Sequence, residues 1–477
     1  MHWSKYNFLF NSQRFGFFLY NSLSNVFFKL DERHYRLLGK MQDKTLRSDL
    51  DMDDKFMKHL RKNKIFVEKG EEKKLLLSRQ YLRASRCFDP TRLSLTICPT
   101  LGCNFRCPYC IEDTQNNTAV MSAETVNQLI KFVKNFKKAK KLSVAWYGGE
   151  PTLAFEVICN IALKLNKLGV SCNKSFLFTN GYLLNKNIID QLNDLKINAL
   201  QITLDGFKER HDKYRKLAGR EPTYDRIMHN IEMISNSSYK GMCIIRIHVD
   251  KNTLPHFLVQ RESLMGMFNG KKISVYAAHL ENRDGNSSHK SCSFLADDWS
   301  DFIIGMYREY GFAPEGGFYP KSRDMTICTA NFCNGFIIGP EGELYKCMKD
   351  VGKKEMILGS IWREPPVTNI ELQSMYSIGT DPHLDVECRA CRVLPICRGG
   401  CPNMRLRAKY FNEKGLDFCS PYKDNLIKYL EEYYHMFLTK EVCDETLNPG
   451  SEVKNSQGYR AIHPSGNENL HLLSLSV

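Results

Sequence analysis

The chain has 477 residues, 43% of them apolar, and its formal net charge at pH 7 is +14. This length is too great for one compact core and predicts two or three domains, with a composition ordinary for a globular enzyme. No apolar run approaches the about 18 residues that a membrane helix needs, so we expect no membrane partner. The charge suits an acidic partner, but the lysines, as in residues 134–141, are spread out without an RNA-binding pattern. We therefore favour a solvated basic face or an acidic peptide partner over nucleic acid.

The first 88 residues predict three strands followed by short helices. The strand-like runs are residues 6–10, 16–20 and 25–30, and apolar residues at helical spacing follow at 35–41 and 54–66. This order predicts a winged-helix-like module over residues 1–88, whose exposed strand edge could accept an extended peptide by strand addition. An equally weighted alternative is that the module only caps the next domain.

Strands and helices alternate through residues 89–285. The predicted strands are residues 93–97, 143–146, 176–179, 199–204, 243–249 and 273–278, and helical stripes lie at 126–136, 188–195 and 227–234. About six parallel β/α units predict an α/β fold with a partial (β/α)6 TIM-like barrel. In such sheets the active site lies at the carboxyl ends of the strands. Four polar motifs follow strands in this way, at residues 103–110, 148–150, 179–181 and 205–206.

Eleven of the 18 cysteines fall into two ordered groups. The first group is a C-x3-C-x2-C triplet of Cys103, Cys107 and Cys110. The second contains Cys328, Cys333, Cys347, Cys388, Cys391, Cys397, Cys401 and Cys419. Cubane iron–sulfur clusters take four protein sulfurs when full, so three plus eight predicts one cluster with an open, reactive iron and two saturated clusters. Zinc is the alternative, because paired C-x2-C units often bind it, although the triplet has no nearby fourth Cys or His.

The rest of the chain shows weaker patterns. Residues 286–320 predict a connector, and residues 321–425 contain the eight cysteines with little regular pattern. Residues 426–477 predict a helix, with Leu426 and Leu430 on its apolar face, and then a polar, disordered tail. No secretory signal is evident and the other seven cysteines are scattered, so we expect a cytoplasmic protein.

These motifs resemble those of the radical S-adenosylmethionine (radical SAM) superfamily, in the branch with a C-terminal SPASM domain, over residues 91–425. Cys103, Cys107 and Cys110, with Tyr109 before the last, resemble the family's cluster triplet. In that family the open iron of a [4Fe–4S] cluster is chelated by S-adenosylmethionine, which is cleaved to a 5′-deoxyadenosyl radical. The resemblance implies that these thiolates are the catalytic cluster ligands, with Tyr109 beside the cofactor, and that the protein positions it.

Two further motifs carry implied cofactor contacts. Gly148-Gly149-Glu150-Pro151 resembles the motif for the methionine amino group, in which glycines permit close approach and Glu150 can accept from an ammonium. Thr203-Leu204-Asp205-Gly206 and Arg215 resemble the family's S-x-D-G…R segment. That match places Thr203 at the ribose and Arg215 at the carboxylate. A surface ion pair of Arg215 with Asp212 or Glu209 is the alternative.

The eight-cysteine region resembles the two-cluster SPASM form of anaerobic sulfatase-maturating enzymes. The resemblance implies one auxiliary [4Fe–4S] cluster on Cys328, Cys333, Cys347 and Cys401, and another on Cys388, Cys391, Cys397 and Cys419, which makes three clusters in all. The gap between Cys328 and Cys333 is one residue shorter than in those enzymes. They also carry an acidic base directly after the third ligand, where this chain has Met348, with Asp350 two positions further on. This departure argues against formylglycine formation.

The leading hypothesis combines these resemblances. Residues 1–88 also resemble leader-peptide recognition elements, so we expect a radical SAM enzyme that oxidatively modifies a ribosomally synthesised precursor peptide by thioether crosslinking at Cys. An electron donor such as flavodoxin or ferredoxin would serve it. The alternatives are maturation of a larger protein, such as a sulfatase or a quinone-cofactor enzyme, and an iron–sulfur scaffold or sensor without turnover.

Overall fold

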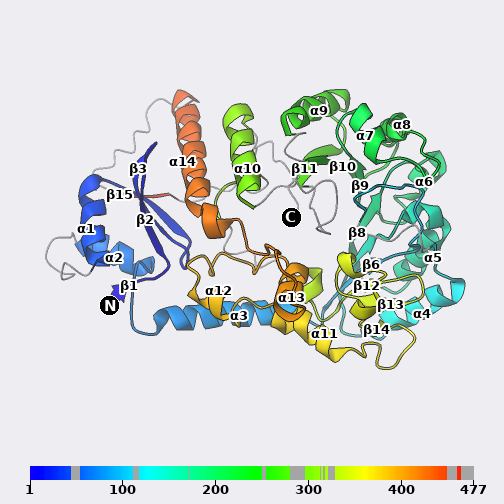
Figure 1. The fold of residues 1–477 in the computed structure, drawn as a ribbon, viewed down its shortest axis with the longest axis horizontal. Coiled ribbons are helices and arrows are strands. Elements are labelled where there is room, and N and C mark those ends of the chain that lie inside the picture. The colour runs from blue at the N-terminus through cyan, green and yellow to red at the C-terminus, as the bar shows by residue number, and fades with distance from the viewer. Residues whose placement is uncertain are drawn as a thin grey trace.

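In the computed structural model, an N-terminal sheet lies at one end of an elongated molecule and a large, mostly parallel sheet at the other (Figure 1). The cysteine-rich segment lies between them. The structure describes residues 1–43, 54–110, 118–169, 171–249, 254–279, 296–311, 313–314, 317–320, 328–447 and 459–462. Within these ranges, no helix is both long and apolar enough to cross a bilayer.

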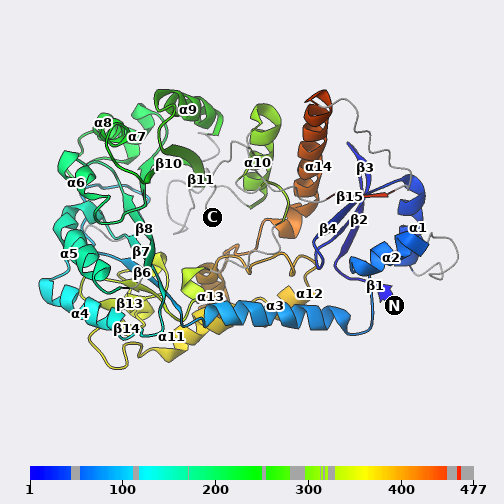
Figure 2. The same ribbon diagram turned by 180° about the vertical axis from the view of Figure 1, so that it is seen from behind.

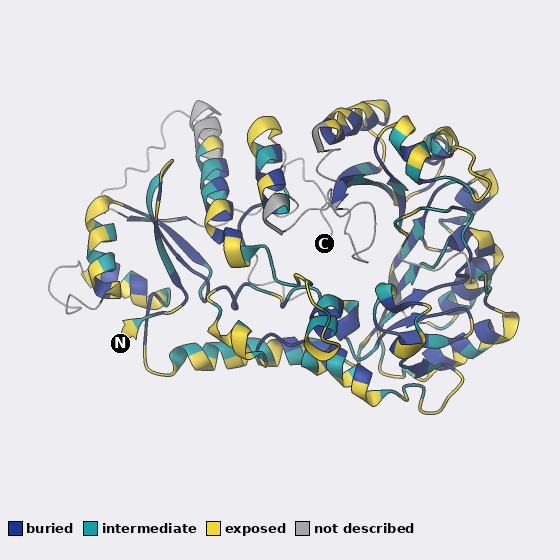
Figure 3. Ribbon diagram, in the orientation of Figure 1, coloured by how far each residue is buried: buried dark blue, intermediate teal, exposed yellow. Residues whose placement is uncertain are grey.

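Six consecutive parallel strands form the centre of the large sheet, in chain order. They are β6 (Arg92–Ile97), β7 (Lys141–Trp146), β8 (Ser171–Thr179), β9 (Ala199–Leu204), β10 (Met242–Val249) and β11 (Ile273–His279). The intervening helices are α4 (Ala123–Lys134), α5 (Phe155–Asn166), α6 (Lys186–Gln191), α7 (Lys208–Tyr214), α8 (Tyr224–Ser235) and α9 (Leu254–Met267). The predicted α/β fold is confirmed, and the sheet is consistent with a partial TIM barrel. Burial explains the pattern, because strand residues are buried while exposed residues lie on the outer faces of the helices (Figure 3).

The cysteine-rich segment extends this sheet. Strand β12 (Gly335–Ile338) pairs in parallel with β6, and β13 (Glu343–Tyr345) and β14 (Gly359–Ser360) continue the sheet in antiparallel pairing. Its helices are α11 (Ile370–Ser374), α12 (Val386–Ala390) and α13 (Pro402–Tyr410), and short 3₁₀ or π turns cover Thr329–Asn331, Met348–Asp350, Lys354–Met356 and Met375–Gly379. One further 3₁₀ turn, Pro151–Ala154, lies between β7 and α5. The expectation of little regular pattern here is wrong for these elements, because all four residues of β12 are buried in the shared core.

The N-terminal module is a separate sheet with helices on one face. Its elements are β1 (His2–Trp3), β2 (Asn7–Ser12), β3 (Gly16–Asn21), β4 (Val26–Leu30), α1 (Glu32–Gln42), α2 (Asp54–Lys62) and β5 (Phe66–Val67). Three strands and two helices follow in the predicted order. The predicted helix over 54–66 is wrong at its end, because Phe66 lies in β5 and pairs with Trp3 of β1.

A fourth strand joins this sheet from the other end of the chain. Strand β15 (Tyr459–Ile462) pairs in antiparallel with β4, which gives the order β15-β4-β3-β2. The predicted disordered tail is therefore wrong for these four residues, and also for the part that lies within α14 (Tyr422–Leu447). The rest of the tail, residues 448–458 and 463–477, lies outside the described residues.

Three long helices connect the two sheets (Figures 1 and 2). α3 (Glu71–Cys87) runs along the cysteine-rich segment, where Arg79 donates to the main-chain oxygens of Leu23 and Pro395 at 2.7 and 2.6 Å. α10 (Ala296–Tyr310) lies in the predicted connector and packs beside α14, the predicted C-terminal helix. Leu426 and Leu430 of α14 are buried as predicted.

A buried carboxylate ties α14 to its neighbours. The Glu432 side chain is fully buried and pairs with both Arg14 of the N-terminal module and Arg308 of α10. A second pair between the same helices, Lys428 with Asp301 at 2.6 Å, is exposed. Buried pairs are costly to break because the remaining charge loses its partner, whereas exposed pairs contribute little.

We expect the Glu432→Gln variant to be roughly 2 kcal/mol less stable than the parent, because two arginines lose their buried partner. The matched Asp301→Asn variant should differ from the parent by less than about 0.5 kcal/mol, because its pair is exposed. Anaerobic thermal and denaturant unfolding of both variants tests this contrast. Equal destabilisation by the two substitutions would contradict it.

Candidate active site

The predicted motifs converge at the carboxyl ends of the parallel strands. The cysteine triplet follows β6, the glycine pair follows β7, Thr179 ends β8, and Asp205 follows β9. The triplet loop is braced by main-chain hydrogen bonds from Arg106 N to Lys216 O and from Ala218 N to Asn104 O, both of 2.9 Å. These contacts hold the loop across the rim of the sheet.

The triplet thiols lie at the surface of this loop. Cys103 and Cys107 are half-buried and Cys110 is exposed. Burial raises the pKa of Cys103 to about 12 and that of Cys107 to about 11, so both are neutral thiols at pH 7 without a metal. Metal binding would release their protons, and three thiolates are the donor set that iron–sulfur clusters take. In the described part of the chain no three Cys, His, Asp or Glu side chains already surround one metal position, so the ligand roles remain predictions.

Two adjacent glycines pack against the start of the triplet loop. Gly148 has a φ of +115°, and a β-carbon there would lie 2.2 Å from Thr100 O. A β-carbon on Gly149 would lie 2.2 Å from Gly102 O. Only glycine tolerates this geometry, and it lets Gly149 N and Glu150 N donate to Thr100 O and Gly102 O at 3.2 and 2.8 Å. The glycines therefore serve close backbone packing.

Glu150 is buried at the centre of a polar cluster. Its carboxylate is 1% exposed and accepts from the Thr152 amide and hydroxyl, the Thr179 hydroxyl at 2.7 Å and the Asn180 amide at 2.6 Å. Burial raises the pKa of Glu150. Asn180 in turn donates to Asn104 Oδ1 at 2.7 Å, which links the end of β8 to the triplet loop. Both carboxylate oxygens of Glu150 already accept hydrogen bonds within the protein. A hydrogen bond from an ammonium group of the cofactor to Glu150 therefore remains a prediction.

A second network joins the triplet to β9 and β10. Tyr109 donates to Asp205, His248 Nδ1 donates to Asp205 Oδ1 at 3.0 Å, and Arg215 donates to the Tyr109 hydroxyl at 3.2 Å. Burial opposes ionisation of Asp205, but the hydrogen bond from His248 and the charge of Arg215 hold its pKa well below its usual range. Burial and the charge of Arg246 lower the pKa of His248 to about 4, so this histidine is neutral at pH 7.

Arg215 has the features of an anion-binding group. It is 9% exposed, and its Nε is buried without a hydrogen-bond partner among the described residues. The alternative ion pair with Asp212 is wrong, because Asp212 instead accepts from the amides of Thr223 and Tyr224. No ion pair joins Arg215 to Glu209 either, and both residues are described. A carboxylate would satisfy the free Nε, so this residue fits the predicted cofactor.

Sequence reasoning missed His248 and the cavity beside it. Gly206, His248, Phe257 and Gln260 are among the residues that line a cavity of about 150 Å³. The available signal was the position of His248 near the end of a predicted strand, next to the strand that Asp205 follows. Thr203 lies half-buried in β9, and its contact with a ribose remains a prediction.

Six of the eight further cysteines fall into two neighbourhoods. Burial and Asp350, followed by Cys401 and Cys328, raise the pKa of Cys347. Around Cys419, burial and the charge of Asp417, then Cys397 and Cys388, raise the thiol pKa. These interactions place Cys347 near Cys401 and Cys328, and Cys419 near Cys397 and Cys388, while the two implied ligand sets remain predictions. Cys333 instead donates its amide to Cys87 O at 2.9 Å, and the main-chain turn from Cys388 O to Cys391 N places Cys391 beside Cys388.

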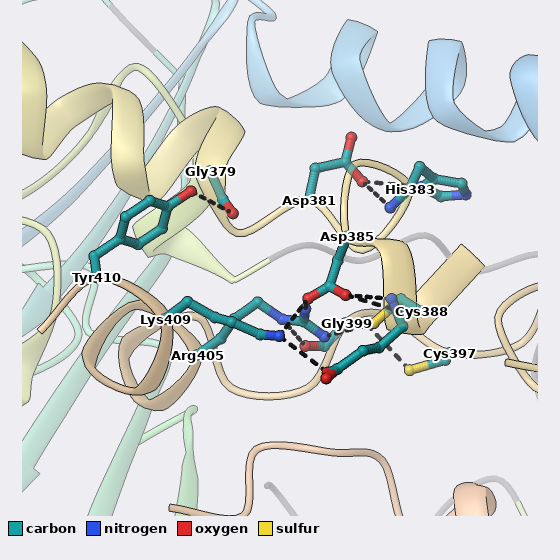
Figure 4. A network of polar contacts seen from close by, with 11 residues as sticks. Gly379, Asp381, His383, Asp385, Cys388, Cys397, Gly399, Arg405, Lys409 and Tyr410 are labelled. Carbon is teal, nitrogen blue, oxygen red and sulfur yellow. Dashed lines mark hydrogen bonds and ion pairs between the residues drawn. The ribbon is translucent and has the colours of Figure 1, made fainter. Parts of the chain in front are cut away.

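Arg405 lies at the centre of the second neighbourhood (Figure 4). This 2%-exposed guanidinium donates to Cys388 Sγ at 3.2 Å, to Asp385 Oδ2 at 3.0 Å and to Gly399 O at 2.9 Å. Lys409 also pairs with Asp385 at 3.2 Å, and its other partner is Glu387 at 3.0 Å. A buried cation next to a thiolate stabilises negative charge on sulfur.

Comparison with known proteins identifies the class. Residues 97–255 match the family model of the Radical SAM superfamily. The chain is 29% identical over 344 residues to the cysteine-type anaerobic sulfatase-maturating enzyme of Clostridium novyi (strain NT), with 65% of this chain and 87% of the relative covered. It is 21% identical to the serine-type enzyme of Klebsiella aerogenes, with 63% and 77% covered. The chain therefore belongs to the radical SAM superfamily and is a radical SAM enzyme.

Solved structures support the fold. Native anSMEcpe with bound AdoMet and Cp18Cys peptide superposes with a TM-score of 0.55 at 22% identity, covering 73% of this chain and 98% of that chain. A histidine-tagged form of anSMEcpe with bound AdoMet gives the same TM-score and identity. About a quarter of this chain thus has no counterpart there.

We expect the Gly149→Ala variant to bind S-adenosylmethionine at least about tenfold more weakly, because its methyl group would push residues 101–102 away and shift the triplet loop. Gly266→Ala in α9 is the matched control, since no atom lies within 4 Å of its β-carbon. Equilibrium dialysis of the reconstituted proteins measures both affinities. Unchanged binding by the Gly149 variant would show that this contact does not position the loop.

Proposed function

We propose that this enzyme oxidatively modifies a ribosomally synthesised peptide, by thioether crosslinking at Cys. The observation that carries the proposal is the edge of β4, which pairs in antiparallel with an extended segment, β15. An edge that accepts one strand suits capture of a peptide by strand addition. Residues 1–88 would form the winged-helix-like recognition module, residues 89–285 the radical SAM domain, residues 286–320 the connector, and residues 321–425 the SPASM domain.

The rim residues would hold the cofactors. A [4Fe–4S] cluster with S-adenosylmethionine on its open iron supplies the 5′-deoxyadenosyl radical. Cys103, Cys107 and Cys110 would hold that cluster, and Arg215, with its free buried Nε, would bind the methionine carboxylate. Gly148, Gly149 and Glu150 would fix the loop that faces the amino group, and Thr203 and Tyr109 would line the site.

The recognition module packs directly against the proposed auxiliary-cluster region. Lys5 and Ser22 donate to the main-chain oxygens of Arg389 and Arg392 at 2.9 and 2.6 Å. Arg392 also lies over the Phe8 ring at 4.1 Å.

A thioether forms with loss of two hydrogens, one as an atom and one as a proton plus an electron. The electron needs an acceptor, and auxiliary clusters on the eight cysteines would provide one. An external flavodoxin or ferredoxin would supply the reducing electron.

Maturation of a larger protein is the second candidate, since the curated relatives are sulfatase-maturating enzymes. Sulfatase-maturating enzymes carry an acidic base at the position of Met348, and Asp350 does not take over that role. It is fully buried, donated to by Tyr376 and by Asn403 Nδ2 at 2.8 Å. A carboxylate enclosed in this way cannot reach a substrate, which favours the peptide.

Incubation of the reduced enzyme with S-adenosylmethionine and a candidate Cys-containing precursor peptide tests the proposal. We expect 5′-deoxyadenosine and a peptide about two mass units lighter per crosslink, because each thioether removes two hydrogens. The Cys103→Ala variant should yield neither product. Deoxyadenosine without any change in peptide mass, across the candidate peptides, would favour the protein-substrate alternative, and none at all would indicate a scaffold. Deleting residues 1–88 is a poor test, because it would expose the apolar residues of α14 that pack on this module.

The Arg405→Lys variant should lower the reduction potential of one auxiliary cluster by on the order of tens of millivolts, because a hydrogen bond to cluster sulfur stabilises the reduced state. Lys409→Gln removes a charge from the same network and leaves the Arg405 contact with sulfur in place, so it should shift the potential much less. Anaerobic redox titration followed by electron paramagnetic resonance, with iron content near twelve per chain as the check of assembly, measures both. Equal shifts in the two variants would contradict the role of the sulfur contact.

A further inference from the structure

The β4 edge is covered by a segment that lies more than 400 residues away in sequence (Figure 2). In the pairing, Tyr459 lies opposite Leu30, Arg460 opposite Lys29, and Ile462 opposite Phe27. Alternate side chains of a strand point to opposite faces of a sheet. Tyr459 therefore shares a face with Leu30, and Ile462 shares the other face with Phe27.

Two side chains of β15 complete the apolar cores on the two faces. Tyr459 is 8% exposed, with its ring centroid 4.1 Å from that of Phe56 in α2 and 5.8 Å from that of His59. Ile462 is 1% exposed and packs with Phe18 and Phe27 on the face toward α14. Any peptide that paired with β4 in this register would need an aromatic residue and an aliphatic residue three positions apart.

One pair in the strand is mismatched. Arg460 and Lys29 lie directly opposite, and like charges in this position are destabilising, although Arg460 also lies over the Phe437 ring at 4.8 Å and Lys29 also donates to the main-chain oxygen of Phe15. Lys29 is already half-buried over the Phe18 ring at 4.6 Å, and burial lowers its pKa. An acidic residue in place of Arg460 would pair with Lys29, and the chain's net charge of +14 also favours an acidic peptide.

We infer that β15 is an intramolecular occupant of the peptide-docking edge, which an external peptide with an aromatic, an acidic and an aliphatic residue in the positions of Tyr459, Arg460 and Ile462 displaces. This inference rests on the proposed function for the identity of the edge as a substrate site. A tethered strand has an effective concentration on the order of 1 mM. An external peptide of equal intrinsic affinity therefore binds weakly until the cis strand is weakened, and the Arg460–Lys29 mismatch makes the cis strand the easier one to displace.

The test uses synthetic peptides with the sequence of residues 455–466 as probes, in the natural form and with Arg460→Glu. The proteins are the parent, a release variant with Tyr459→Ser and Ile462→Ser, and a control with Tyr81→Ser and Leu77→Ser on the exposed side of α3, where those side chains are 72% and 65% exposed. Fluorescence anisotropy measures peptide binding, and hydrogen exchange reports the protection of the β4 amides.

We expect the release variant to bind the natural peptide at least about tenfold more tightly than the parent or the control. Its β4 amides should exchange at least about tenfold faster until peptide is added. The Arg460→Glu peptide should bind more tightly than the natural one, and a Lys29→Gln substitution in the release background should abolish that preference. Equal peptide binding by parent and release variant, equal exchange of β4, or no preference for the acidic peptide would overturn the inference.

The outcome is separable from that of the proposed function. Cleavage of S-adenosylmethionine without peptide should proceed at the same rate in the parent and the release variant, since β15 lies in the other sheet. Equal rates show that the parallel sheet of the release variant is folded, and protection of its β4 amides on addition of peptide shows that the N-terminal sheet is folded. Displacement of β15 with no radical modification of any peptide would contradict the proposed chemistry alone. Modification of a precursor peptide without displacement of β15 would contradict the β15 inference alone.

Discussion

The contact between the end of β7 and the loop after β6 is the constraint on which the site depends. Gly148 and Gly149 allow two main-chain hydrogen bonds across a gap that no β-carbon could enter. This packing fixes residues 100–102, and the triplet thiols follow directly in the chain. A cluster bound there would have its position set by backbone geometry more than by the thiols themselves, which suits chemistry that needs a reactive atom held still.

Buried polar groups link the other strand ends around the site. Glu150 links β7 to β8, and Asp205 links β9 to β10 through His248. Among the buried atoms of these networks in the part of the chain that the structure describes, Arg215 Nε is the one cationic atom without a hydrogen-bond partner, and the Asn104 amide nitrogen also lacks one. The rim is thus rigid where it supports the triplet and unsatisfied where an anionic ligand would bind. This division between supporting and receptive groups is expected of a preorganised site.

Sequence patterns predicted the parallel sheet well because its strands are buried runs with clear ends. The predicted strand 199–204 coincides with β9, and the motifs at the strand ends follow from the topology of a parallel sheet. Patterns failed where partners are distant or contacts are polar. Strand β12 has only four residues and depends on its pairing with β6. Helix α3 is held by polar contacts of Arg79 and Arg83, and it exposes Leu77 and Tyr81. Strand β15 is stabilised by a sheet from the other end of the chain. The partner of Asp205, His248, was missed for the same reason.

The central claim is that a cluster on Cys103, Cys107 and Cys110 keeps one iron free for S-adenosylmethionine. The most direct measurement uses the protein with the eight auxiliary cysteines replaced by alanine, so that the triplet alone can bind a cluster. Electron–nuclear double resonance of its reduced form with ¹⁵N- and ¹⁷O-labelled S-adenosylmethionine reports contact between iron and the amino and carboxylate groups. We predict hyperfine coupling to both labels. A reduced cluster whose spectrum shows no coupling to either label would contradict the claim.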